Sequence, residues 1–83
     1  MNSIEIKASR RTFTCTNKDK IMYNGAVYIL ITQKYFDGWH EVCPNISKTE
    51  FNRLKKLGVL SEPYEKLGFG GIKLTMYDFV LDV

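Results

Sequence analysis

The chain has 83 residues and 9.6 kDa, with 12 basic and 9 acidic side chains and a formal net charge of +3. Its hydrophobic (45%) and charged (25%) contents are ordinary for a folded domain and argue against a disordered chain, a coiled coil or a disulfide-rich scaffold. A chain of this length has a thin core, so we expect residues 1–83 to form one small domain.

The hydropathy of the sequence indicates where in the cell the protein is expected. The longest apolar run covers residues 26–31, far below the roughly 18 residues that span a bilayer, and the first residues lack the pattern of a signal peptide. We therefore expect a cytoplasmic protein. Because the cytosol keeps thiols reduced, Cys15 and Cys43 are expected to be reduced and buried rather than bridged.

Two stretches near the N-terminus alternate between apolar and polar residues. Residues 4–8 and 12–16 both have the period of two that is typical of strands. The inward-facing parity changes from even to odd between them, so residues 9–11 must contain a turn or a bulge. A polar loop is expected over residues 17–20.

Two dipeptides predict tight hairpins. Asn24-Gly25 and Asp37-Gly38 each separate apolar stretches and tolerate the positive φ angles of a two-residue type I′ turn. The second turn would pair residues 33–36 with residues 39–42, with Phe36 opposite Trp39. Odd residues of the strand 27–35 then form the core face.

The next segment carries local signals for a helix. Pro44 is expected to end the strand ladder, and Ser47 with Glu50 forms a capping box. Gly58 matches a left-handed C-terminal cap, which predicts a helix over residues 48–57. Three apolar residues at helical spacing are expected to face inward: Phe51, Leu54 and Leu57.

The C-terminal third is predicted to be a loop followed by a strand. Residues 61–68 are expected to form a loop or one short helical turn, and a strand runs from Ile72 to about Leu81. A change of parity predicts a bulge near Tyr77 and Asp78. The order strands–helix–strand predicts an α+β fold: a small antiparallel β-sheet with two tight hairpins and one α-helix packed on one face.

The titratable residues do not suggest catalysis. His40 is the single imidazole, and Cys15, His40 and Cys43 are too few and wrongly spaced for a zinc motif. The glycines of residues 68–71 lack both a following helix and a Lys-Ser/Thr pair, so they indicate a turn rather than a phosphate loop. We expect no enzymatic activity, no metal and no cofactor.

Aromatic residues surround the second predicted hairpin tip. The four rings are those of Tyr35, Phe36, Trp39 and His40. Exposed rings at a tip could form a hot spot for a protein partner or a platform on which bases stack. In an equally weighted alternative, Phe36 and Trp39 close one end of the core and only Tyr35 and His40 are exposed to water.

Basic side chains form a second candidate surface. They are Arg10, Arg11, Lys48, Arg53, Lys55 and Lys56. Such a surface could contact nucleic-acid phosphates or an acidic protein. The alternative, which we favour, is a solvated helix face whose cations lie near the helix C-terminus.

In general character the chain resembles a class of small proteins. Its length, its Lys, Asn, Ile, Tyr and Phe content, and the run Gly38-Trp39-His40 followed by residues 47–60 are similar to those of small accessory or early proteins of phages and mobile elements from low-GC Gram-positive bacteria. The resemblance implies a stoichiometric binder of a host or defence protein, such as an anti-CRISPR or a host-takeover inhibitor, or a nucleic-acid accessory factor.

One fragment has a second resemblance. Thr49–Leu60 resembles the recognition helix of a winged helix-turn-helix, followed by a wing-like strand. That fold needs an earlier helix to set the recognition helix across the DNA groove, and the pattern upstream predicts strands.

Taken together, the residues favour a non-enzymatic protein-interaction module that modulates a host or defence component. One alternative is a small nucleic-acid-binding accessory protein that uses the basic helix face. Another is a homo-oligomeric structural protein in which the apolar second face of the sheet, or an edge strand, pairs with itself.

Overall fold

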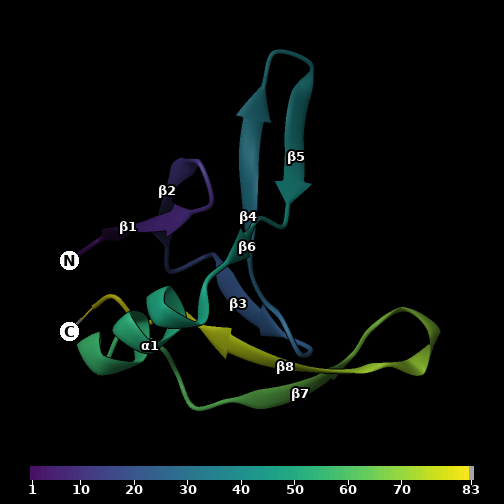
Figure 1. Ribbon diagram of the computed structural model, residues 1–83. Helices are drawn as coiled ribbons and strands as arrows, with labels where there is room; N and C mark the ends of the chain where they lie inside the picture. The colour runs from purple at the N-terminus through teal and green to yellow at the C-terminus, as the bar shows by residue number, and fades with distance from the viewer. Residues whose placement is uncertain (83) are drawn as a thin grey trace.

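Antiparallel strands make up most of the molecule (Figure 1), and the computed structural model describes residues 1–82. The elements are β1 (Ser3–Ala8), β2 (Arg11–Thr16), β3 (Lys20–Tyr23), β4 (Val27–Tyr35), β5 (Gly38–Val42), β6 (Asn45–Ile46), α1 (Lys48–Leu57), β7 (Tyr64–Leu67), a 3₁₀ turn (Phe69–Gly71) and β8 (Lys73–Asp78). The main sheet has the order β5-β4-β3-β8-β7, with β6 also on β4, and β1 and β2 form a separate hairpin. The predicted α+β class is confirmed.

One hydrophobic core lies between the main sheet on one side and α1 with the β1–β2 hairpin on the other. Side chains from all three parts are buried together in it: Ile4, Ile6, Ala8, Phe13, Cys15, Ile21, Val27, Ile29, Ile31, Ile46, Phe51, Leu54, Val59, Phe79 and Leu81. The alternating strand residues are therefore sorted as their period of two requires.

The N-terminal hairpin confirms the predicted break. Ala8 pairs with Arg11 across a two-residue turn, and Ser9 adopts a φ of 50°. This turn allows even residues of β1 and odd residues of β2 to face the same core.

Helix α1 has the predicted bounds. The Ser47 hydroxyl accepts a hydrogen bond from the Glu50 backbone N–H (3.1 Å), and Gly58 is left-handed at a φ of 71°. The expected burial of Leu57 is wrong, because its side chain is 51% exposed. The helix ends at Leu57, and after the cap it is Val59 that enters the core.

The first hairpin has a different loop from the one predicted. Tyr23 pairs with Val27, so the loop is Asn24–Ala26 and has three residues instead of two. In this register Ile21 lies opposite Ile29, and both side chains are fully buried. The shorter loop would have placed Tyr28 opposite Ile21 and turned one strand away from the core.

The second hairpin turns one residue earlier than predicted. Tyr35 pairs with Gly38, so the two-residue loop is Phe36-Asp37, and Trp39 lies opposite Lys34 rather than Phe36. The pairing partners shift by an even number of residues, so the assignment of side chains to faces is unchanged. Odd residues of β4 face the core, as predicted.

Pro44 does not end the ladder. The Ile29 N–H donates to the Pro44 carbonyl (2.9 Å), and pairing with β4 resumes at β6. Proline lacks an N–H, but its carbonyl still accepts a hydrogen bond, so β6 keeps the register of β5.

The C-terminal segment corrects two predictions. Residues 64–67 form β7, an edge strand on β8, and not a loop or a helical turn. The pairing of β8 with β3 continues to Asp78, so there is no bulge within β8 near Tyr77 and Asp78. Met76 is 1% exposed, although it belongs to the sheet face opposite Tyr77. The change of parity therefore reflects two apolar faces of the sheet and not a bulge. Val83, the last residue of this alternating pattern, lies outside the described residues.

The cysteines differ in their surroundings. Both are free: Cys15 is buried, as predicted, but Cys43 is exposed, so its expected burial is wrong. Burial raises the pKa of the Cys15 thiol to about 12, which leaves it protonated and unreactive. Within residues 1–82 no helix is long and apolar enough to cross a membrane.

Candidate interaction surface on the β4–β5 arm

The β4–β5 hairpin extends beyond the rest of the sheet as an arm (Figure 1, top). Strand β3 pairs with β4 only as far as Leu30, whereas β5 pairs with residues 31–35. We call residues 31–42 the arm. A two-stranded ribbon has little core of its own, so its side chains remain largely exposed.

The arm presents its rings to solvent. Phe36 is 105% exposed and Trp39 is 67% exposed, and Tyr35 and His40 are exposed to a smaller extent. The alternative in which Phe36 and Trp39 close the core is therefore wrong. The structure brings all four predicted residues together at one tip.

Polar contacts hold two of the rings on the core side of the arm. Tyr35 and His40 meet edge to face, with centroids 5.2 Å apart, and His40 Nε2 lies 2.8 Å from Asp37 Oδ1. The Tyr35 hydroxyl donates to Gln33 Oε1 (3.2 Å). A hollow of about 400 Å³ here is lined by Tyr35, Phe36, Asp37, His40, Glu41 and Val42.

Part of the β1–β2 hairpin and the loop after it border the face of the arm that carries Trp39. A hollow of about 520 Å³ is lined by Thr14, Thr16, Lys18, Asp19, Thr32 and Trp39. The Trp39 indole thus borders a groove with polar walls. On the core side of the arm, Arg11 Nη2 donates a hydrogen bond (3.4 Å) to Gln33 Oε1, the oxygen that also accepts from the Tyr35 hydroxyl.

Three of the six predicted basic residues are already engaged within the molecule. Arg53 donates to Glu50 and to the Glu5 carbonyl. The Arg11 guanidinium lies 4.6 Å from the Phe13 ring centroid, and the Lys55 ammonium lies 4.6 Å from that of Phe51. Of these three residues, Arg53 is paired with a carboxylate, whereas Arg11 and Lys55 pack on a ring and keep their charge.

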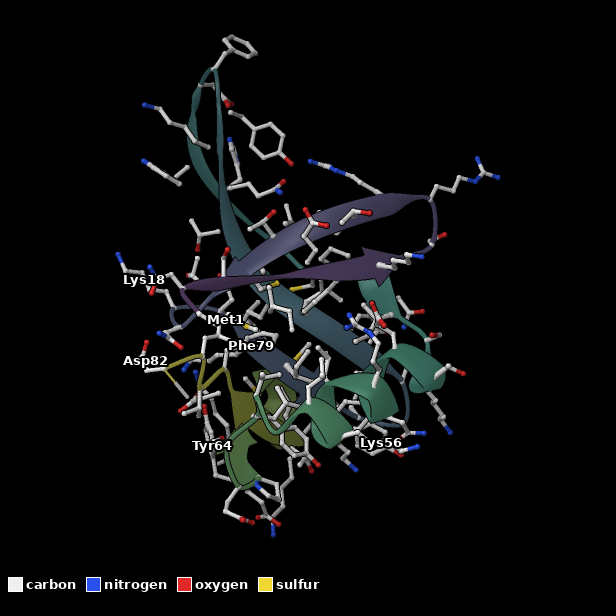
Figure 2. The ribbon with its side chains drawn as sticks, turned by 90° about the vertical axis from the view of Figure 1, so that its left-hand side faces the viewer. Met1, Lys18, Lys56, Tyr64, Phe79 and Asp82 are labelled. Atoms are coloured by element: carbon white, nitrogen blue, oxygen red, sulfur yellow. The ribbon has the colours of Figure 1, made fainter. Side chains whose placement is uncertain are left out.

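The other three basic residues are spread over different elements. Arg10 lies in the β1–β2 turn, whereas Lys48 and Lys56 lie near opposite ends of α1. Figure 2 shows Lys56 directed outward from α1, with the β1–β2 turn higher on the same side of the molecule. The carboxylates of Glu5 and Glu50 lie at a hollow between these elements, so the basic surface is divided.

Sequence reasoning missed a polar cluster on the second sheet face. The Lys20 ammonium and the Tyr64 hydroxyl both donate to Asp78 Oδ1 at 2.6 Å. These two hydrogen bonds lower the pKa of the Asp78 carboxyl, and the one from Lys20 has the larger effect. The cluster joins β3, β8 and β7, and its members are too far apart in sequence for any local pattern to reveal it.

An exposed ring outside the arm was also not predicted from the sequence. Phe69 lies in the loop of the β7–β8 hairpin and is 102% exposed, with Leu67 and Ile72 exposed beside it. The only local signal was an aromatic residue set among the glycines of residues 68–71.

Among residues 1–82, no three His, Cys, Asp or Glu side chains gather as a metal site would require. Comparisons with protein-family models, with curated proteins and with solved structures find no match. The geometry of the arm is therefore the basis for a functional proposal.

Proposed function

We propose that the protein is a non-enzymatic protein-interaction module that binds a macromolecular partner through the tip of the β4–β5 arm. The observation that carries this proposal is the exposure of Phe36 and Trp39 on the same projecting hairpin. Large rings gain much from leaving water, and aromatic residues are enriched among the side chains that dominate protein interfaces.

The fixed positions of Tyr35 and His40 support the same proposal. Their contact with each other, and that of His40 with Asp37, hold the base of the tip in one conformation. A preorganised surface loses less conformational entropy on binding than a mobile one. The tip therefore combines two exposed rings, those of Phe36 and Trp39, with an ordered support.

The proposed class of partner is a host or defence protein in the bacterial cytoplasm. This part rests on the resemblance of the chain to small accessory proteins of phages and mobile elements. Such proteins act by stoichiometric binding, and an arm of exposed rings suits an inhibitor or modulator of that kind. The use of the basic surface to bind nucleic acid is the competing function.

The test compares two equally exposed phenylalanines on different hairpins. The immobilised protein and its Phe36→Ala, Trp39→Ala and Phe69→Ala variants are used to capture partners from bacterial lysate, with and without nuclease. Affinities are then measured with the purified retained protein. We expect Phe36→Ala and Trp39→Ala to weaken binding by about 30-fold or more, as hot-spot residues do, and Phe69→Ala to leave it unchanged.

Circular dichroism of each variant checks that the fold is intact. Unchanged affinity in folded Phe36→Ala and Trp39→Ala variants would contradict the proposal. Recovery that disappears with nuclease would favour nucleic-acid binding, and replacement of Lys55 and Lys56 together should then reduce the salt dependence of the affinity.

A further inference from the structure

The molecule exposes more surface than a monomer of its mass should. Folded monomers of 9.6 kDa expose about 5,100 Å², whereas this chain exposes 5862 Å². The excess is roughly 750 Å². The projecting arm contributes to this extra exposed area.

The outer edge of β5 offers unpaired backbone groups. Two-residue hairpins close with a hydrogen-bonded pair, here Tyr35 with Gly38, and bonded and non-bonded pairs then alternate. The Ile29 N–H bond to Pro44 agrees with this alternation. Trp39 and Glu41 therefore point their N–H and C=O groups away from β4, where the main sheet of residues 1–82 has no further strand.

Two of the other strand edges, those of β1 and β7, are protected. The edge of β1 is covered by α1, because the Lys7 N–H donates to Glu50 and the Glu5 carbonyl accepts from Arg53. The edge strand β7 follows Pro63 and carries exposed charged side chains. Strand β5 has no lysine, proline or bulge, and its one acidic residue is Glu41.

We propose that a second copy of this chain occupies the β5 edge, and that the two β5 strands pair antiparallel about a twofold axis at His40. In this register Trp39 lies opposite Glu41 of the second copy, and Glu41 opposite its Trp39. Each of these pairs joins residues whose backbone groups point outward, so four backbone hydrogen bonds form between the copies. The β4–β5 ribbons become one four-stranded sheet.

Charge selects this register over its neighbours. A twofold axis at Glu41 would place the two Glu41 carboxylates opposite each other, and an axis at Trp39 would place Glu41 opposite Asp37. Like charges directly opposite destabilise a strand pair. An axis at His40 avoids both arrangements and keeps outward-pointing groups paired.

The proposed register also covers the exposed indole. The two Trp39 rings become diagonal neighbours on one face of the new sheet, within the reach of aromatic side chains. Phe36 lies beyond the paired residues and remains accessible, with the two arm tips pointing in opposite directions. Self-association thus goes beyond the proposed function: the dimer leaves Phe36 available to a partner, whereas Trp39 is available only in the monomer.

The first experiment is sedimentation equilibrium of the full chain across the micromolar range, with two proline variants. Glu41→Pro removes an outward N–H on β5, whereas Lys34→Pro removes one on the opposite edge of the same arm. We expect a dimer whose dissociation constant rises by about 30-fold or more in Glu41→Pro, since each dimer loses two hydrogen bonds, and changes little in Lys34→Pro.

A cysteine pair tests the register without proline. In a Cys43→Ser background, His40→Cys places two thiols at a non-hydrogen-bonded pair, where Cα atoms lie about 4.5 Å apart and a disulfide can form. We expect mild oxidation to cross-link His40→Cys but not Lys34→Cys. A monomer at every concentration, a dimer weakened only by Lys34→Pro, or equal cross-linking of both variants would overturn the proposal.

Discussion

Glu50 joins the helix to the N-terminal hairpin. Its carboxylate accepts a hydrogen bond from the Lys7 N–H of β1 (2.7 Å) and from Arg53 Nη2 (3.0 Å). The hydrogen bond from Arg53, followed by that from Lys7, lowers the pKa of Glu50 below its ordinary value of 4.5. The residue predicted as part of a capping box is thus used mainly for a contact between distant elements.

This carboxylate predicts a loss of stability in acid. Because its pKa is lower in the folded than in the unfolded state, Glu50 stabilises the fold above pH 4.5 and this contribution is lost as the pH falls through the folded-state pKa. We expect Glu50→Gln to lower the free energy of unfolding by about 2 kcal/mol at pH 7 and by less at pH 3. Urea denaturation at both pH values measures the difference.

Glu65→Gln is the matched control. Glu65 is exposed and lies 3.8 Å from the Lys73 ammonium, a surface pair of small energetic value. A Glu50→Gln effect of equal size at both pH values would show that the ionised carboxylate contributes nothing beyond its shape.

At the scale of elements, the helix cap yields a second prediction. The Ser47 hydroxyl is the side-chain acceptor for the Glu50 N–H at the start of α1. Ser47→Ala should lower the free energy of unfolding by about 1 kcal/mol. Ser47→Asp should keep most of the stabilisation by the cap, because a carboxylate oxygen can accept the same hydrogen bond. Urea denaturation at neutral pH distinguishes them, and equal losses in both variants would contradict a capping role.

Helix α1 could be predicted to the residue because its signals are local. Ser47 and Gly58 determine the ends without help from distant residues. The hairpin registers depend on partners across the sheet, since the opposition of Ile21 and Ile29 decided between a two-residue and a three-residue loop. Strand β7 has no buried face, so an alternation of buried and exposed side chains could not predict it.

At the scale of the whole molecule, the sheet has two apolar faces. One is the main core, and on the other face the pairing places Tyr64, Met76, Met22 and Tyr28 in one row across four strands. From the sequence alone, Met76 could be assigned to the main core only if the C-terminal strand contained a bulge. A cluster on the second face removes that need and explains the burial of Met76.

The candidate site was predictable in composition but not in exposure. The turn dipeptide and four nearby rings located the tip, whereas the exposure of Phe36 and Trp39 depends on how far β4 extends past β3. The basic surface was predicted from charge alone. The acidic residues that divide it are Glu5 and Glu50, which are far apart in sequence and line the same hollow.

The change of neighbours along β4 has a consequence for motion. Ile29 lies between β3 and the extension of β5, whereas Gln33 has only β5 beside it. Hydrogen exchange should therefore differ along one strand: the Gln33 amide exchanges through opening of the arm, and the Ile29 amide only through global unfolding. Equal protection in NMR exchange experiments would contradict this difference. One continuous strand would thus belong to two cooperative units, so the arm can open while the domain remains folded.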